Sequence, residues 1–169
     1  LVGQSKTGSG KTAAFALPIL QTMVLQPRIL QALIVCPTRE LSAQVAREVR
    51  TLGRKHDGLV VAVLTGGEPF AHQADSLRRG VHVVVATPGR LLDHLRRGTL
   101  ETGGVTTVVL DEADRMLDMG FQEDVETILS ALPKQRQTVF FSATFPERMQ
   151  AMSRTHQRDA VWLAIDEGA

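Results

Sequence analysis

Short apolar runs recur along the chain, and each is followed by a segment in which apolar residues return every three or four positions. Within the runs, apolar residues do not alternate with polar ones, as they do in strands with one solvated face. Such runs are typical of strands that are buried on both faces of a parallel sheet. We expect these strands at residues 32–36, 59–64, 81–86, 105–110, 138–141 and 161–165, with the stub of another at Leu1-Val2.

Amphipathic segments between the runs predict helices. Leu41, Val45 and Val49, for example, lie four residues apart and would share one face of a helix. Further helices are expected after residue 12 as far as about residue 24, from 70 to 79, around 91–95, from 123 to 132, and from 146 onward. Strands that alternate with helices indicate an α/β fold, a parallel sheet with helices on both faces. Such sheets bind their ligands beyond the carboxyl ends of the strands.

Composition narrows the class of protein only slightly. The 169 residues are 43% hydrophobic and 22% charged, as in an ordinary globular domain, and the net charge of +1 neither requires nor excludes a nucleic-acid partner. No apolar run reaches membrane-spanning length, so we expect no membrane partner. Cys36 lies in an apolar run and is expected to be a buried thiol in a reducing compartment, the cytoplasm. The five histidines lack metal-ligand spacing.

The stretch Ser5-Lys6-Thr7-Gly8-Ser9-Gly10-Lys11-Thr12 predicts a phosphate-binding loop at the start of a helix. Gly8 and Gly10 permit backbone angles that turn successive N–H groups inward, and the helix N-terminus adds a favourable dipole. Lys11 supplies a cation for the terminal phosphates, and the hydroxyl of Thr12 can ligate Mg²⁺. The strict pattern begins with glycine where this chain has Ser5, a small residue that an ordinary backbone angle accommodates. The alternative is a Gly/Ser-rich linker.

Two carboxylates follow an apolar strand at Val108-Val109-Leu110-Asp111-Glu112. Beside a phosphate loop, Asp111 is suited to hold the hydration shell of Mg²⁺, which prefers hard oxygen ligands. Glu112 is suited to orient or deprotonate the attacking water. We therefore predict Lys11, Asp111 and Glu112 as catalytic residues and Thr12 and Asp111 as metal ligands, which requires Lys11 and Asp111 to be neighbours. The alternative is a solvated acidic turn that caps the next short helix.

Six motifs together resemble the first RecA-like domain of the DEAD-box RNA helicases. They occur in the order and with the spacing of that family, and they cover essentially the whole chain. The motifs are residues 5–12, Pro37-Thr38-Arg39-Glu40-Leu41, Thr65-Gly66-Gly67, Thr87-Pro88-Gly89-Arg90, Asp111-Glu112-Ala113-Asp114 and Ser142-Ala143-Thr144. Residues 67–70, 90–95 and 157–159 are similar to a bacterial branch of the family that acts on large-subunit ribosomal RNA.

The resemblance implies that ATP and Mg²⁺ bind at residues 5–12 together with Asp111. It also implies that Asp114 hydrogen-bonds to Ser142 and Thr144 at a neighbouring strand end. These hydroxyl groups would report the state of the nucleotide to the RNA side. An alternative, compatible with the first, is that Ser142-Ala143-Thr144 caps a helix that Pro146 opens.

The resemblance further implies an RNA-binding surface. Its residues are Arg39, Gly66, Gly67, Thr87, Gly89 and Arg90. The glycines lack side chains, so a sugar-phosphate backbone could approach their amides, and each arginine can form forked bonds to a phosphate. Aromatic residues make up only 4% of the chain, which favours binding that follows the RNA backbone regardless of sequence. The alternative for either arginine is an internal ion pair, for example with Glu40 or Asp93.

The function implied by the resemblance is that of an ATP-dependent RNA helicase that couples ATP hydrolysis to local RNA unwinding, in the setting of large ribosomal subunit assembly. We expect residues 1–169 to be its N-terminal RecA-like domain, truncated at its start, because the chain lacks an initiator Met and the adenine-reading segment of the family. A second RecA-like domain, absent here, would supply arginines to the γ-phosphate. The piece alone is therefore expected to be a monomer with almost no activity.

Two rival functions stay open from the sequence. One is a P-loop NTPase of another class, such as a DNA translocase, and the other is an RNA-binding scaffold in which the phosphate loop is vestigial. Asp111-Glu112-Ala113-Asp114 together with Ser142-Ala143-Thr144 argues against the first. The intact Lys11 and Thr12, with both acidic residues, argue against the second.

Overall fold

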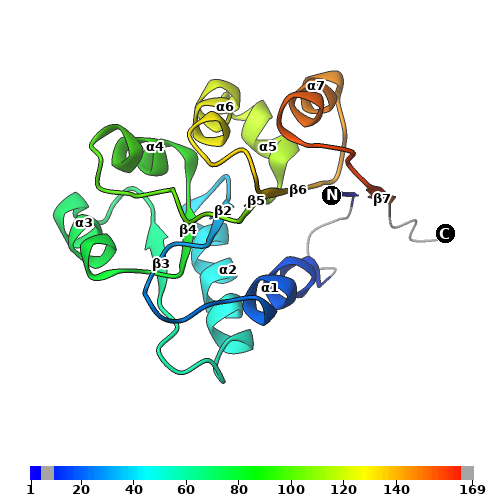
Figure 1. Cartoon of the computed structure of the whole chain (residues 1–169). Coiled ribbons are helices and arrows are strands. Elements are labelled where there is room, and N and C mark those ends of the chain that lie inside the picture. Colours follow the sequence, from blue (N-terminus) through cyan, green and yellow to red (C-terminus); the bar gives the residue numbers. More distant parts are fainter. Residues whose placement is uncertain (5–9, 165–169) are drawn as a thin grey trace.

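The computed structural model describes residues 1–4 and 10–164. In those ranges seven strands form one sheet in the order β3-β4-β2-β5-β6-β1-β7 (Figure 1), and all neighbouring strands run parallel. The strands are β1 (Val2–Gln4), β2 (Ala32–Val35), β3 (Val61–Leu64), β4 (Val83–Ala86), β5 (Thr107–Leu110), β6 (Gln137–Ser142) and β7 (Trp162–Ala164). The helices are α1 (Lys11–Gln21), α2 (Arg39–Leu52), α3 (Phe70–Arg79), α4 (Pro88–Arg96), α5 (Ala113–Asp118), α6 (Gln122–Ser130) and α7 (Glu147–His156).

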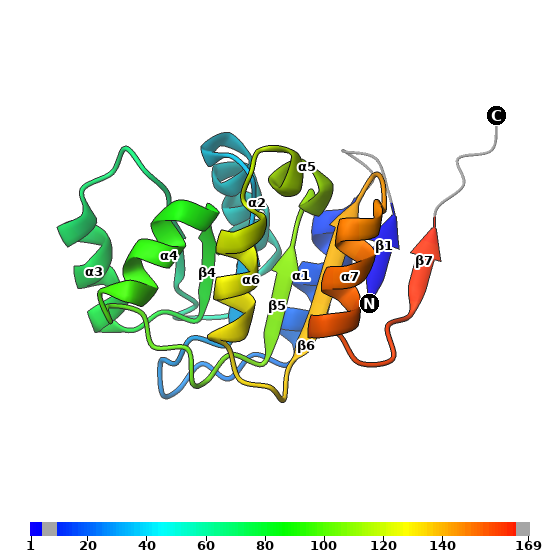
Figure 2. The same cartoon turned by 90° about the horizontal axis from the view of Figure 1, so that it is seen from above.

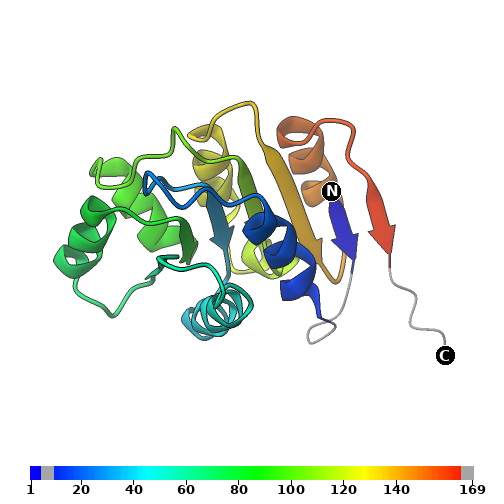
Figure 3. The same ribbon diagram turned by 60° about the horizontal axis from the view of Figure 1, so that its bottom comes forward.

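Helices cover both faces of the sheet, as the sequence predicts. α1 and α2 lie on the face that Figure 3 brings forward, where Phe15 and Val45 belong to one buried apolar cluster. α4, α5, α6 and α7 lie on the opposite face (Figure 2), where Leu91, Ile128 and Met149 belong to a second cluster. α3 lies beside α4 near the β3 edge. The α/β class with a parallel sheet covered on both faces is therefore confirmed.

The first strand of the chain lies near the far edge of the sheet. Val2 of β1 pairs with Phe140 of β6 on one side and with Trp162 of β7 on the other. β7 forms the edge of the sheet, and Trp162 is 50% exposed. Its ring packs edge-on against Phe145, with the ring centroids 4.8 Å apart. Trp162 is therefore an edge-packing residue and not a core residue.

The first helix is shorter than predicted. α1 ends at Gln21 and not near Val24, because the backbone of Val24 is bound by the side chain of Gln31. The amide N of Val24 donates to Gln31 Oε1 at 2.9 Å, and Gln31 Nε2 donates to the carbonyl O of Val24 at 2.6 Å. Pro18 lies inside α1 without ending it. Three more helical residues follow Pro18, and two of them, Ile19 and Leu20, are buried against the core.

Three strands begin two residues later than their apolar runs. β3, β4 and β5 start at Val61, Val83 and Thr107, because ladder pairing with the neighbouring strands begins only there. The short helix α5, directly after the acidic pair, has no counterpart among the predicted helices. No helix in the described ranges is long and apolar enough to cross a membrane.

Candidate functional site

The start of α1 presents the described part of the predicted phosphate loop. Gly10 is its N-cap and has φ 74°, a left-handed angle that glycine adopts without strain. Lys11 and Thr12 follow in the first turn and are 8% and 9% exposed. The other predicted loop residues lie outside the described residues; they are Ser5, Lys6, Thr7, Gly8 and Ser9.

Lys11 and Asp111 meet at the carboxyl end of the sheet. The Nζ atom of Lys11 lies 3.0 Å from Oδ1 of Asp111, and the two side chains are 8% and 0% exposed. Asp111 directly follows β5, and its amide N donates to the carbonyl O of Val35 at 2.9 Å. The predicted proximity of the lysine and the first carboxylate is therefore present, although about 100 residues separate them in the sequence.

The carboxylate of Asp111 has unused capacity to accept hydrogen bonds. Both of its oxygens are buried; Oδ1 faces the ammonium of Lys11 at 3.0 Å, and among the described residues Oδ2 has no hydrogen-bond donor. Burial raises the pKa of this carboxyl group, and the charge of Lys11 opposes that rise. A buried carboxylate oxygen without a donor is costly unless a cation or water completes it. The donor set therefore fits a hydrated Mg²⁺.

Glu112 adopts a backbone conformation that a non-glycine residue rarely takes. Its φ and ψ are 51° and 49°, and it is the N-cap of α5 without a capping hydrogen bond from its side chain. Its carboxylate is paired with Nη1 of Arg115 at 3.2 Å. Strained residues of this kind concentrate at functional sites. A short helix follows the acidic pair with Glu112 at its N-cap, as the alternative expected, but Asp111 is fully buried and is not part of a solvated turn.

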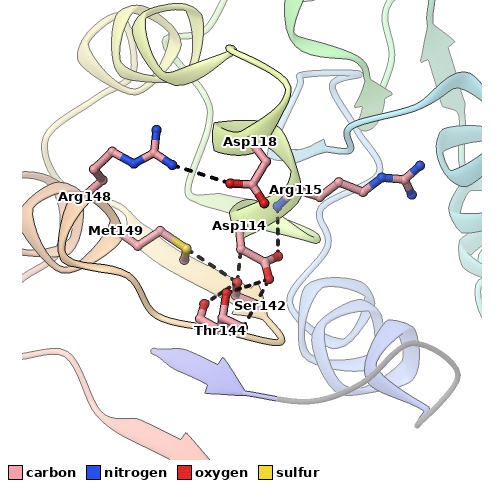
Figure 4. Close-up of polar contacts among 7 residues, drawn as sticks. All are labelled: Asp114, Arg115, Asp118, Ser142, Thr144, Arg148 and Met149. Carbon is pink, nitrogen blue, oxygen red and sulfur yellow. Dashed lines mark hydrogen bonds and ion pairs between the residues drawn. The ribbon is translucent and has the colours of Figure 1, made fainter.

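Asp114, Ser142 and Thr144 form the predicted cluster of polar contacts (Figure 4). The backbone N and the Oγ1 atom of Thr144 both donate to Asp114 Oδ2, at 3.2 and 3.0 Å. The amide N of Asp114 donates to Ser142 Oγ at 3.2 Å, and Ser142 Oγ donates to the carbonyl O of Thr144 at 2.7 Å. The N-cap of α7 is Pro146, with no capping bond from a side chain, so the helix-cap alternative is wrong.

The six residues predicted to contact RNA follow the carboxyl ends of β2, β3 and β4 and lie in two adjoining hollows. A hollow of about 620 Å³ gathers five of them. These are Arg39, Gly66, Thr87, Gly89 and Arg90. The sixth, Gly67, lies with Gly66 against Arg39 in an adjoining hollow of about 490 Å³. Larger hollows of about 790 and 870 Å³ are lined by none of the predicted site residues.

Gly66 and Gly67 lie against the guanidinium of Arg39, in addition to leaving the surface open. A Cβ atom on Gly67 would lie 2.6 Å from Nη1 of Arg39, and one on Gly66 would lie 3.3 Å from its Nη2. Gly67 also has φ +89°. Thr38 caps α2 by accepting from the amide N of Leu41 at 3.2 Å, which fixes the helix start that carries Arg39. The missing side chains therefore make room for the guanidinium, which the sequence did not reveal.

Neither arginine forms the internal ion pair considered from the sequence. Among the described residues, no carboxylate lies within ion-pair distance of Arg39 or Arg90, and Asp93 pairs with Arg97 at 2.9 Å. Nη1 of Arg90 instead donates to the carbonyl O of Glu68 at 2.9 Å and to Gln73 Oε1 at 3.0 Å. These neutral acceptors hold Arg90 without cancelling its charge.

Gln73 is a residue that sequence reasoning missed. It is 6% exposed and lies on α3, and its side chain bonds to three residues in two other parts of the chain, the loop after β3 and α4. The available signal was its position four residues before Leu77 on the apolar side of the expected helix, where a polar residue needs partners. A second buried polar residue, His94, is one of those partners.

Cys36 and His82 are buried. Cys36 is 0% exposed, and burial together with the nearby charge of Asp111 raises the pKa of its thiol well above the usual range. His82 is buried and is bonded to the amide N of Val60 and the carbonyl O of Leu25. Within the described part of the chain, no group of three or more His, Cys, Asp or Glu side chains could hold a metal ion.

Comparison with known proteins agrees with this geometry. The DEAD/DEAH box helicase family model matches residues 1–152. The chain belongs to the DEAD/DEAH box helicase family. Among solved structures, the chain is similar to the crystal structure of a DEAD box protein from the hyperthermophile Methanococcus jannaschii, with a TM-score of 0.92 and 41% sequence identity. The match covers 96% of this chain and 44% of that chain. A hypothetical ATP-dependent RNA helicase from Sulfolobus tokodaii gives a TM-score of 0.88 at 40% identity, with 97% and 47% covered.

Curated members of the family are similar over nearly the whole chain. The ATP-dependent RNA helicase DbpA of Escherichia coli is 51% identical over 163 residues, which are 96% of this chain and 36% of DbpA. The ATP-dependent RNA helicase DeaD of Buchnera aphidicola is 49% identical over 165 residues, which are 98% of this chain and 27% of DeaD. The chain thus spans about a third of the length of these family members.

Proposed function

We propose that residues 1–169 are the N-terminal RecA-like domain of an ATP-dependent RNA helicase. The observation that carries this proposal is the 3.0 Å contact between Lys11 and Asp111. It joins the lysine of the phosphate loop to the first carboxylate of the acidic pair at the edge of the sheet where ligands of α/β domains bind. A vestigial loop or a linker would not require a buried lysine opposite a buried aspartate.

In this proposal the triphosphate of ATP binds at residues 5–12, with the ammonium of Lys11 on its terminal phosphates. The hydroxyl of Thr12 and the carboxylate of Asp111 hold Mg²⁺, whose bound form neutralises charge on the phosphate oxygens. The carboxylate of Glu112 orients the attacking water and accepts its proton. The left-handed backbone of Glu112 supports this role, because rarely adopted conformations of this kind concentrate at functional sites.

Asp114, Ser142 and Thr144 couple the nucleotide to the RNA side in this proposal. Asp114 belongs to the same turn as Asp111 and Glu112, so a nucleotide that moves this turn also moves the loop after β6 through the Thr144 contacts. RNA lies along Arg39, Gly66, Gly67, Thr87, Gly89 and Arg90, which contact its phosphates and sugars. Recognition is independent of base sequence because this surface offers no row of stacking platforms.

We extend the proposal to the longer protein of which the chain would be a part. Its relatives DbpA and DeaD are named ATP-dependent RNA helicases, and this chain matches only about a third of each. A second RecA-like domain would close on this one and supply arginines that accelerate hydrolysis by about 10³–10⁵. RNA of the large ribosomal subunit is the proposed substrate class, and the protein acts as a cytoplasmic monomer.

Binding of Mg-ADP tests the nucleotide site. We expect a thermal-shift titration of this chain to show stabilisation by Mg-ADP, because a ligand at ten times its Kd adds about 1.4 kcal/mol to the free energy of unfolding. For a domain of this size the increase in Tm is about 3–5 °C. ADP with a chelator should give a clearly smaller shift, and Asp111→Asn should abolish the metal dependence. An unchanged Tm at millimolar Mg-ADP would support the scaffold function instead.

Nucleic-acid preference tests the RNA surface against the DNA translocase alternative. We expect fluorescence anisotropy at low salt to show tighter binding of oligouridine than of oligothymidine, because the contacts lie on the sugar-phosphate backbone, where only RNA has a 2′-hydroxyl. Arg39→Ala should weaken RNA binding about three- to tenfold through the loss of forked phosphate contacts. Arg154→Ala, an exposed arginine on α7, is the matched control. Equal affinity for RNA and DNA would favour the translocase class.

A further inference from the structure

Gln73 joins two parts of the proposed RNA surface through one buried amide. Its Nε2 donates to the carbonyl O of Thr65 at 2.9 Å, in the loop that continues into Gly66 and Gly67. Its Oε1 accepts from Nη1 of Arg90 at 3.0 Å. One side chain on α3 therefore touches both the glycine loop after β3 and the arginine on α4. Arg90 also bonds to this loop directly, because its Nη1 atom donates to the carbonyl O of Glu68 at 2.9 Å.

The orientation of this amide is fixed by its partners. The guanidinium of Arg90 can only donate, so the atom of Gln73 that faces it must be the oxygen. The same oxygen lies 2.9 Å from Nε2 of His94, which must then carry the proton. The Nδ1 atom of His94 accepts from Thr99 Oγ1 at 2.7 Å. Burial and the charge of Arg90 lower the pKa of His94, so the ring stays neutral in this arrangement.

An aromatic stack lies next to this hydrogen-bond network. The ring of Phe70 lies on that of His94, with centroids 4.1 Å apart and an interplanar angle of 13°. The guanidinium of Arg97 lies 4.2 Å from the centroid of Phe70, and Arg97 is itself paired with Asp93. His94 is 0% exposed beneath this stack. The bonds of Gln73 to Thr65 and His94 are buried and its bond to Arg90 is partly buried, and in such surroundings a hydrogen bond is stronger and its loss more costly.

We propose that Gln73 is the positioning residue of the RNA surface: it fixes the guanidinium of Arg90 relative to the glycine loop so that both meet successive phosphates of one strand. This inference rests on the proposed RNA-binding function. With Nη1 of Arg90 held by Gln73 and by the carbonyl O of Glu68, the Nη2 and Nε atoms remain for a forked phosphate contact. Gln73 is buried and itself touches no RNA.

A role in packing alone does not require glutamine at this position. An apolar side chain of similar volume would fill the same space without the cost of burying an amide. The amide uses both acceptor positions and one N–H on three partners in two segments, the loop after β3 and α4, which is an arrangement that fixes orientation. The two roles separate experimentally, because a packing role predicts a change in stability only.

The test measures how RNA affinity depends on salt in single and double variants of this chain. We expect Gln73→Met to weaken oligouridine binding about tenfold and to reduce the slope of log K against log salt by about 0.7, the contribution of one single-strand phosphate contact. Arg90→Ala should give the same loss of slope. In the Arg90→Ala background, Gln73→Met should cost less than twofold, because its effect passes through Arg90. Gln137→Met, an exposed glutamine at the start of β6, should change nothing.

The outcomes distinguish the inference from the function on which it rests. If Arg90→Ala leaves affinity and slope unchanged, the proposed RNA surface is wrong. If Arg90→Ala weakens RNA binding but Gln73→Met does not, only the positioning role is wrong. The same holds if Gln73→Met lowers RNA affinity tenfold both in the wild-type chain and in the Arg90→Ala variant. Should Gln73→Met fail to fold, Gln73→Glu is measured instead. It keeps both acceptor bonds and neutralises the charge of Arg90, so it must reduce the slope of log K against log salt by the same amount. A normal slope with Gln73→Glu overturns the inference, and the Mg-ADP thermal shift should persist in every folded variant.

Discussion

Replacing Glu112 with glutamine is expected to reduce ATP turnover by about 10²–10⁴-fold while ATP and RNA still bind. Glutamine has the shape of glutamate but cannot accept the proton of the attacking water. The assay uses a chimera in which this chain replaces the matching part of E. coli DbpA, because the chain alone is expected to turn over almost no ATP. RNA-stimulated phosphate release and binding of a fluorescent ATP analogue are measured on the same preparation.

A matched control isolates the position of this carboxylate. Glu123→Gln changes an exposed acidic residue in the first turn of α6 and should leave turnover unaltered. The left-handed backbone of Glu112 matters to the choice of substitution, because a β-branched residue there would add backbone strain to the chemical change. Turnover that survives Glu112→Gln at the wild-type rate would remove the water-handling role from this residue.

Removing Lys11 is expected to reduce the stability of the domain by about 3–5 kcal/mol near pH 8. Lys11→Ala leaves the fully buried carboxylate of Asp111 without its cation, and a lone buried charge is far more costly than a lost pair. Urea denaturation of the nucleotide-free chain measures the loss. The same variant should show no stabilisation by Mg-ADP, since the proposed phosphate cation is gone.

The loss of stability in Lys11→Ala should shrink as the pH falls. Burial already raises the pKa of Asp111, and Lys11 is the main group that opposes the rise. Without Lys11 the folded-state pKa rises further above the unfolded value of about 3.9. The folded state then binds more protons than the unfolded state over that interval, so the free energy of unfolding increases as the pH decreases.

Two further variants make this prediction specific. Lys11→Met combined with Asp111→Leu replaces both partners and should recover most of the lost stability, because no charge is left buried. Lys134→Ala removes an exposed lysine and should have little effect. A loss in Lys11→Ala that is independent of pH would mean that the carboxylate of Asp111 is not the group left unpaired.

The sequence predicted those parts of the molecule that local pattern and motif spacing determine. β2 follows from an uninterrupted apolar run, and the contact of Lys11 with Asp111 follows from two polar clusters that each succeed a parallel strand. The contact of Asp114 with Thr144 was predicted from the resemblance to the helicase family. The functional roles of these residues remain predictions, since geometry alone does not test them.

Features that depend on a distant partner were missed. α1 ends early because the side chain of Gln31 binds the backbone of Val24, and no local pattern announces that pairing. The left-handed backbone of Glu112 arises from the junction of β5 with α5 and leaves no trace in residue type. The amide of Gln73 meets partners that the chain brings together only after β4 and α4 are in place.

The placement of β1 between β6 and β7 has a consequence for synthesis on the ribosome. Of the strands described, β1, which leads into the predicted phosphate loop, is the first to emerge, yet both of its ladder partners emerge after residue 136. In a nascent chain that ends before that point, Val2 has no neighbouring strand to pair with, and the position of Lys11 is not fixed relative to the sheet. If nucleotide binds as proposed, we expect binding competence to be acquired only when the domain is almost fully translated, and folding during synthesis to begin with the β2, β4 and β3 half of the sheet.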